Sequence, residues 1–80
     1  MSVVNRVKEY RKKAKITQTE LAKKANVSRQ SIYAIETQKS EPSLDLAFKL
    51  SMILDVEFTE LFIWSLEDKT NEPIPAFSIF

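Results

Sequence analysis

The sequence contains no cysteine, no histidine and no glycine. Without cysteine the chain can form neither a disulfide nor a thiolate metal site, and without histidine it lacks the usual general base and the commonest metal ligand. A glycine-rich phosphate loop is also excluded. No apolar run approaches the roughly 20 residues that span a bilayer, and the first residues lack the apolar core of a signal peptide. We therefore expect a cytoplasmic protein that is not an enzyme, with no cofactor, no metal and no membrane partner.

The charges divide unevenly between the two halves of the 80-residue chain. Residues 1–40 carry ten Lys or Arg against three Glu, a balance of +7, whereas residues 41–80 carry two Lys against eight Asp or Glu, a balance of −6. Six of the eight aromatic residues lie in the second half. This division predicts that the first half contacts a polyanion and that the second half supplies core and interface. On charge alone, a solvated basic surface is the alternative.

Helix start and stop signals mark a pair of short helices. Residues 17–20 (TQTE) fit a capping box, in which the Thr17 hydroxyl and the Glu20 carboxylate each accept a backbone amide of the other residue. Asn26 is the expected end of that helix, because asparagine tolerates the left-handed conformation. Ser28 is a good N-cap for the next helix. Two capped helices joined by a three-residue turn are therefore predicted.

The apolar spacing predicts an all-α fold with five helices, over residues 5–14, 18–26, 29–37, 44–54 and 57–62. The fourth is apolar on two faces and is expected to be the centre of the core. Residues 62–66 and 2–4 could pair as a small two-stranded antiparallel sheet. Residues 1–66 would then form one domain and residues 67–80 a C-terminal tail. The apolar end of this tail is either disordered or docked onto the body or a protein partner.

The two capped helices resemble the Cro/C1-type (Xre) helix-turn-helix family of phage repressors and of bacterial and archaeal regulators. The resemblance rests on residues 16–25 (ITQTELAKKA) and 27–36 (VSRQSIYAIE), followed by Lys39 and residues 42–44 (PSL), and it covers about residues 5–63. It implies a compact five-helix lambda-repressor-like DNA-binding domain. The ending at residues 60–64 (ELFIW) is similar to compact dimeric regulators of the cytolysin repressor type. The chain departs from the family at Asn26, where glycine is common.

The resemblance also implies roles for individual residues. Arg29 could grip guanine O6 and N7 and Gln30 could pair with adenine, with a solvated helix face as the alternative. Tyr33 could contact a base or a phosphate, or pack on its own helix. Arg11 and Glu36 match a pair that ties the first helix to the third. The candidate DNA-binding residues are Gln18, Ser28, Arg29, Gln30, Ser31, Tyr33 and Lys39.

The aromatic second half suggests a surface for a second copy of the chain. Interfaces favour aromatic side chains, so Phe58, Leu61, Phe62 and Trp64 are candidates for a dimer interface, with the intramolecular core as the alternative. We expect the chain to be a sequence-specific transcriptional regulator, and specifically a repressor. It would bind a palindromic operator in double-stranded DNA as a homodimer through a recognition helix at residues 29–37. The alternative is an antitoxin or protein-interaction module on the same scaffold.

Overall fold

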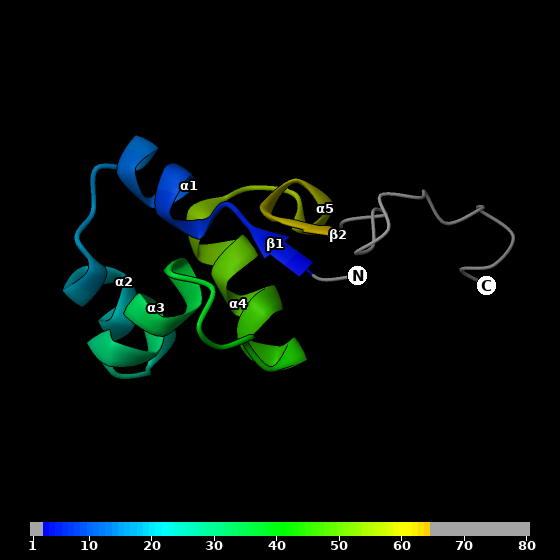
Figure 1. Cartoon of the computed structure of the whole chain (residues 1–80). Helices are drawn as coiled ribbons and strands as arrows, with labels where there is room; N and C mark the ends of the chain where they lie inside the picture. Colours follow the sequence, from blue (N-terminus) through cyan, green and yellow to red (C-terminus); the bar gives the residue numbers. More distant parts are fainter. Residues whose placement is uncertain (1–2, 65–80) are drawn as a thin grey trace, which may run out of the picture.

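The computed structural model of the chain describes residues 3–64. These residues form five helices and a small sheet (Figure 1). In chain order the elements are β1 (Val3–Asn5), α1 (Val7–Lys13), α2 (Gln18–Ala25), α3 (Arg29–Glu36), α4 (Leu44–Leu54), α5 (Phe58–Leu61) and β2 (Phe62–Trp64). The predicted helical class and the five helices are confirmed, whereas the expectations for the tail at 67–80 fall outside the described residues. Within residues 3–64, no helix has both the length and the apolar character needed to cross a membrane.

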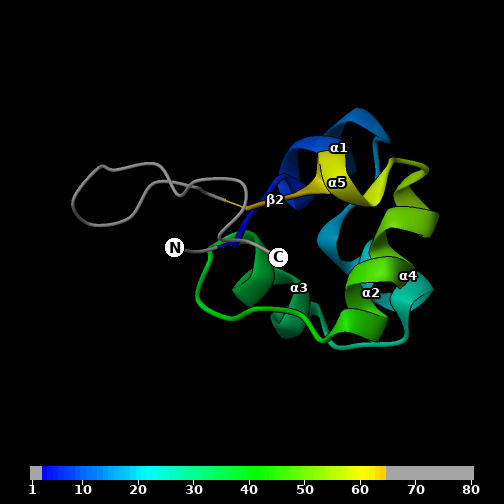
Figure 2. The ribbon, with the colours of Figure 1, turned by 90° about the vertical axis from the view of Figure 1, so that its right-hand side faces the viewer.

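The two strands bring the ends of the described chain together. β1 pairs antiparallel with β2, and Val3 lies opposite Trp64 while Asn5 lies opposite Phe62. The Arg6 amide donates to the Leu61 carbonyl at 2.8 Å and extends the pairing to the end of α5. Figure 2 shows this sheet beside α5, with α1 next to them. The predicted sheet is confirmed, and its first strand lies one residue later than expected.

The core is formed by one face of each longer helix. Small residues sit where helices cross closely: Ala22 and Ala25 of α2 are buried, as is Ala47 of α4. Burial of this apolar surface is the main force that holds the helices together. The largest fully buried side chains are Val7, Leu21, Ile32, Ile35, Leu50 and Leu61.

The outer face of α4 differs from the expectation. Its inner face is buried, but Leu44, Phe48 and Met52 follow one another at steps of four residues and are 68%, 49% and 80% exposed. Side chains at this spacing lie on one side of a helix. The inner face of α4 lies in the core as expected, whereas its outer face is largely exposed and is covered only in part, where Phe58 of α5 packs against Phe48.

Within residues 3–64, four residues with a positive φ take the place of glycine at the ends of helices. Asn26, the predicted one, has φ 58°, and Lys15, Gln38 and Asp55 have φ between 54° and 63°. A left-handed residue after the last turn of a helix lets the chain reverse sharply. For an L-residue other than glycine this conformation costs roughly 1–2 kcal/mol. The chain thus carries a small strain at each of these turns.

Candidate nucleic-acid interface

The helix pair begins with the predicted capping box. The Thr17 hydroxyl accepts the Glu20 amide at 3.0 Å, and the Glu20 carboxylate accepts the Thr17 amide at 2.8 Å. The backbone hydrogen bond from Thr17, followed by the one from its side chain, lowers the pKa of Glu20 below its ordinary value of 4.5. The start of α2 is therefore fixed by side chains on the exposed surface.

The turn between α2 and α3 has the predicted three residues. Asn26 is left-handed, and the Val27 amide donates to the Ala22 carbonyl at 3.0 Å. Ser28 then caps α3, because its hydroxyl accepts the Ser31 amide at 3.1 Å. The two serine hydroxyls lie 3.0 Å apart and share a further hydrogen bond. Together these contacts set the angle at which α3 leaves α2.

The orientation of α3 separates its buried side from its exposed side. Ile32 and Ile35 point into the core, with exposed fractions of 0% and 2%. Arg29, Gln30 and Tyr33 are exposed. The N-terminal half of α3 therefore presents polar side chains to solvent.

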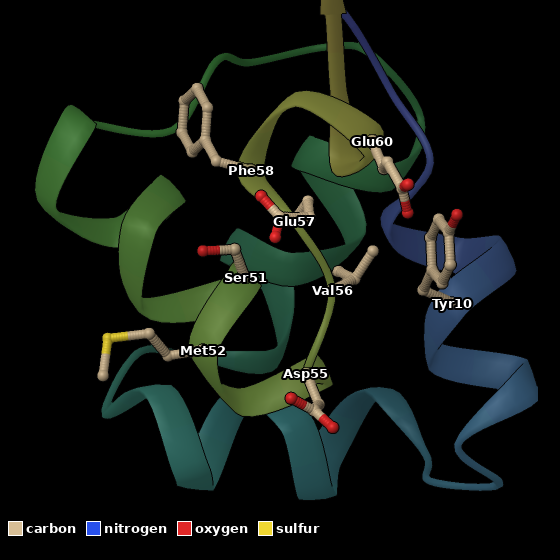
Figure 3. Close-up of a pocket in the computed structure, with 8 residues that line it drawn as sticks. All are labelled: Tyr10, Ser51, Met52, Asp55, Val56, Glu57, Phe58 and Glu60. Carbon is tan, nitrogen blue, oxygen red and sulfur yellow. The ribbon is translucent and has the colours of Figure 1, made fainter.

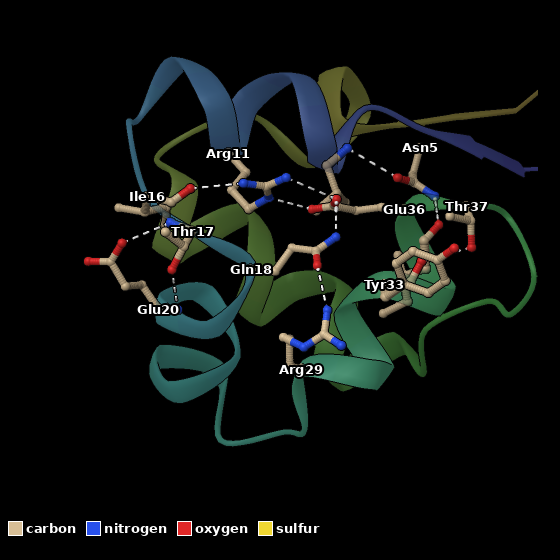
Figure 4. Close-up of polar contacts among 12 residues, drawn as sticks. Asn5, Arg11, Ile16, Thr17, Gln18, Glu20, Arg29, Tyr33, Glu36 and Thr37 are labelled. Atoms are coloured by element: carbon tan, nitrogen blue, oxygen red, sulfur yellow. Dashed lines mark hydrogen bonds and ion pairs between the residues drawn. The ribbon is translucent and has the colours of Figure 1, made fainter.

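A buried ion pair ties α3 to α1. The Arg11 guanidinium donates to both carboxylate oxygens of Glu36, at 2.7 Å and 3.2 Å, and also to the Ile16 carbonyl at 3.0 Å (Figure 4). The side chains of Arg11 and Glu36 are 11% and 2% exposed. The predicted pair is confirmed, and it satisfies the polar groups that α3 brings into the interior.

Gln18 extends this network to the surface. Its Nε2 donates to Glu36 at 3.0 Å, and its Oε1 accepts the Arg29 guanidinium at 3.1 Å (Figure 4). The carboxylate can only accept, so it fixes which end of the amide faces it, and the carbonyl end is left for Arg29. A hydrogen-bonded chain therefore runs from Arg11 in α1 to the first residue of α3. The resemblance had suggested Gln18 as a DNA-binding residue but gave no sign of this bond to Arg29.

The far end of α3 carries a second exposed pair. Tyr33 is 44% exposed, and the Lys39 ammonium lies 5.7 Å from the centre of its ring. At this distance the cation is attracted to the face of the ring. The described structure thus places six of the candidate residues on α3 or next to its ends, Ser28, Arg29, Gln30, Ser31, Tyr33 and Lys39, and the seventh, Gln18, at the start of α2.

Asn5 is a structural residue of this site that the sequence reading missed. Its Nδ2 donates to the Ile35 carbonyl at 2.7 Å, and its Oδ1 accepts the Val7 amide at 3.1 Å. One side chain therefore links β1 to α3 and caps the start of α1. An asparagine two residues before a helix was the available signal, because asparagine favours such caps.

The four candidate interface residues have different surroundings. Leu61 is fully buried and Phe62 is 8% exposed, so the alternative reading as core describes both better. Phe58 is half-buried, with its ring centre 4.6 Å from that of Phe48, and Trp64 is 43% exposed. Beside them lies a groove of about 400 Å³, lined by Val3, Glu41, Pro42, Leu44, Ala47, Phe58, Phe62 and Trp64.

A second hollow, of about 540 Å³, lies between α1, α5 and the end of α4 (Figure 3). The carboxylates of Asp55, Glu57 and Glu60 line it together with Tyr10. Like charges repel, so this hollow is unsuited to a polyanion. No residue of α3 lines this hollow, so the exposed side of α3 and the acidic hollow are separate surfaces.

Comparison with known proteins places the helix pair in a family. A family profile described as helix-turn-helix matches residues 7–61. An uncharacterised helix-turn-helix-type transcriptional regulator of Methanocaldococcus jannaschii is 48% identical over 60 residues, which cover 75% of this chain and 91% of that protein.

Two solved structures are also similar to the chain. The P22 c2 repressor, crystallised with a synthetic operator, is 33% identical with a TM-score of 0.65, over 68% of this chain and 82% of that one. The N-terminal DNA-binding domain of SinR from Bacillus subtilis is 37% identical with a TM-score of 0.62, over 66% of this chain and 78% of that one. The lambda-repressor-like fold implied by the resemblance is thereby confirmed.

Proposed function

The chain belongs to the Cro/C1-type helix-turn-helix family of transcriptional regulators, and from this premise we propose that it is a repressor that reads a palindromic operator as a homodimer. Membership in a family of DNA-binding regulators agrees with the expectation that the chain is not an enzyme. Beyond family membership, we propose which residues contact DNA, that the chain forms a homodimer, and that it represses transcription.

The observation that carries the proposal is the exposed flank of α3. Arg29, Gln30 and Tyr33 are exposed while Ile32 and Ile35 anchor the helix in the core. The major groove admits a helix, and helix-turn-helix proteins read it with the N-terminal residues of the second helix. The similar P22 c2 repressor has been crystallised with a synthetic operator, which supports this placement.

Arg29 is the proposed reader of guanine, and Gln18 is its positioning residue. The guanidinium can bond guanine O6 and N7 in one plane. Gln18 holds the same group through its carbonyl oxygen at 3.1 Å, and Glu36 fixes the Gln18 amide in turn. The orientation of Arg29 is therefore restricted before DNA arrives, which lowers the entropy lost on binding. Gln30 would pair with adenine, while Ser28, Ser31, Tyr33 and Lys39 would contact phosphates or bases nearby.

The proposed dimer would form at the end of the molecule that carries the sheet. Trp64 and Phe58 are the candidate interface residues with accessible surface there. A stable interface buries about 800 Å² on each partner, so these two need neighbours, and exposed Val3 and Val4 on β1 adjoin them. Two recognition helices about 34 Å apart would then meet successive turns of a palindrome. This arrangement resembles the compact cytolysin repressor type, with residues 1–66 as the domain and 67–80 as the tail.

Selection of bound DNA from a random pool tests the reading function. We expect enrichment of a palindrome whose half-sites lie one or more helical turns apart. On the selected site Arg29→Ala should lose about 10- to 100-fold in affinity, equivalent to the roughly 1–3 kcal/mol of one bidentate base contact. Lys8→Ala removes the same charge from an exposed position on α1 and should change affinity much less. Equal losses in both variants, or no enriched sequence, would refute base reading by Arg29.

Sedimentation of the chain and of Trp64→Ser tests the dimer separately. The substitution removes an exposed aromatic side chain, so the melting temperature of the monomer should change little. We expect the dissociation constant of the dimer to rise at least tenfold, as for a central aromatic residue of an interface. An unchanged dissociation constant would place the interface elsewhere.

A further inference from the structure

An exposed apolar surface of the described chain lies apart from α3. It comprises the groove beside β2 and the outer face of α4, where Leu44, Phe48 and Trp64 are 68%, 49% and 43% exposed. Contiguous apolar surface of this kind marks an interaction site. Glu41 is the charged residue that lines the groove. An uncharged apolar partner suits this surface better than a polyanion does.

A segment with these properties follows in the same chain. Residues 74–80 read IPAFSIF, with no charged side chain and with Ile74, Phe77, Ile79 and Phe80 as large apolar residues. Residues 65–73 separate this segment from Trp64, and Trp64 lines the groove. These nine residues can span up to about 30 Å when extended, whereas the 11 residues of α4 are about 16 Å long. The segment can therefore reach any part of this surface.

We propose that residues 74–80 dock into the groove beside β2 of their own chain and cover Leu44 and Trp64. Because a short stretch of chain joins the segment to Trp64, its effective concentration at the groove is in the millimolar range. A second copy of the chain at micromolar concentration competes poorly with such a segment. Docking in cis also removes apolar side chains of both surfaces from water, which is the driving force.

The docked segment makes the tail an internal competitor of dimerisation. Trp64 and Phe58 line the groove and also belong to the proposed dimer interface. One surface cannot be covered by the segment and by a second copy at once. Removal of the segment should therefore strengthen self-association. This consequence rests on the proposed dimer, whereas docking itself does not.

Cross-linking tests docking directly, because the natural chain contains no cysteine. Glu41→Cys with Ser78→Cys places one thiol at the groove and one in the segment while every apolar residue is kept. A short bismaleimide should join the two within one chain. The matched control is Lys23→Cys with Ser78→Cys, since Lys23 is exposed on α2, at the opposite end of the molecule from β2 (Figure 1). No excess of intramolecular product over the control, or a product that joins two chains, overturns docking in cis.

The single tryptophan of the chain, Trp64, gives an independent readout. In a chain shortened to residues 1–72, the Trp64 emission should shift to the red and acrylamide should quench it more strongly, at dilutions where the protein is monomeric. The dissociation constant of the dimer should fall. Glu72→Gln keeps the segment and should behave as the full chain. Unchanged quenching refutes docking, and weaker association of the shortened chain refutes competition. Neither result depends on DNA, so a failure of the proposed operator binding would be seen separately.

Discussion

The two ends of the molecule are stabilised in different ways. The recognition end, comprising α2, α3 and the loop to Lys39, is held by side-chain hydrogen bonds that run from Arg11 to Arg29. The apolar end, comprising β1, β2, α5 and the outer face of α4, presents exposed Leu44, Phe48 and Trp64. β1 belongs to the apolar end although it lies in the basic half of the sequence. The division in space is therefore not the division in charge along the chain.

The contrast agrees with the contact that we propose for each end. A hydrogen bond to a base edge depends on direction, so its donors must be held in place. The hydrophobic effect is non-directional and scales with area, so an apolar surface needs little internal fixation. Gln18 illustrates the first requirement, because both ends of its amide are used within the chain. The outer face of α4 illustrates the second.

Removal of Glu36 should have the largest effect on stability. Glu36→Ala leaves the Arg11 guanidinium buried without its carboxylate, and loss of one partner of a buried pair costs about 3–5 kcal/mol. Urea unfolding at fixed protein concentration measures this change. The control is Glu9→Ala, which breaks an exposed pair with Lys13 at 3.6 Å and should cost about 1 kcal/mol or less. Similar losses in the two variants would show that burial does not distinguish the pairs.

At the apolar end, a substitution of an exposed residue should leave the free energy of unfolding almost unchanged. Met52 is 80% exposed on the outer face of α4, so Met52→Gln should change the free energy of unfolding by no more than about 0.5 kcal/mol. The urea midpoint of this variant can be measured beside that of Glu36→Ala. A large loss would mean that Met52 is covered in the folded protein.

Asn5 joins the two ends, and its removal should have an intermediate effect. Asn5→Ala deletes the donor to Ile35 and the acceptor for Val7, each worth about 0.5–1.5 kcal/mol, so a loss of about 2 kcal/mol is expected. Asn5→Asp keeps the acceptor but sets a carboxylate oxygen against the Ile35 carbonyl. It should therefore retain the cap on α1 and still lose the link to α3. Full stability of Asn5→Ala would exclude a tether between β1 and α3.

Local signals in the sequence predicted the helix pair well. The capping box at Thr17 and the left-handed Asn26 are confirmed, because each depends on residue type at a fixed spacing. The Arg11–Glu36 pair is also confirmed, but the family resemblance implied it and no local pattern did. The tether of Asn5 to Ile35 spans 30 positions, and no local pattern reports it. The exposed outer face of α4 was missed because apolar periodicity shows that a face is oily but not what covers it.

The other left-handed residues were hidden for a related reason. Lys15 and Gln38 have no special tolerance for a positive φ, so their type gives no signal. Lys15→Gly should relieve strain of about 1–2 kcal/mol, part of which is offset by the greater freedom of glycine in the unfolded chain. A net gain of up to about 1 kcal/mol should raise the melting temperature. Asn26→Gly is the comparison, with a smaller gain because asparagine already tolerates this conformation, and a lower melting temperature for Lys15→Gly would contradict the strain.

The smallest expected effect is the pH dependence of the cap on α2. The hydrogen bonds from Thr17 lower the pKa of Glu20 in the folded protein, so the unfolded chain binds the proton more readily. The contribution of the carboxylate is therefore complete above about pH 4.5 and is lost as the pH falls through the lowered folded value. Glu20→Gln can still accept the Thr17 amide, because either residue type completes a capping box, but it carries no titrating charge. The stability of the natural chain relative to this variant should therefore decline in acid, while carboxylates elsewhere cancel in the difference. A difference in stability that stays constant from pH 7 to pH 3 would show that the exposed cap does not favour the charged form of Glu20 over water. The structurally fixed part of the recognition end would then begin only at the buried Glu36.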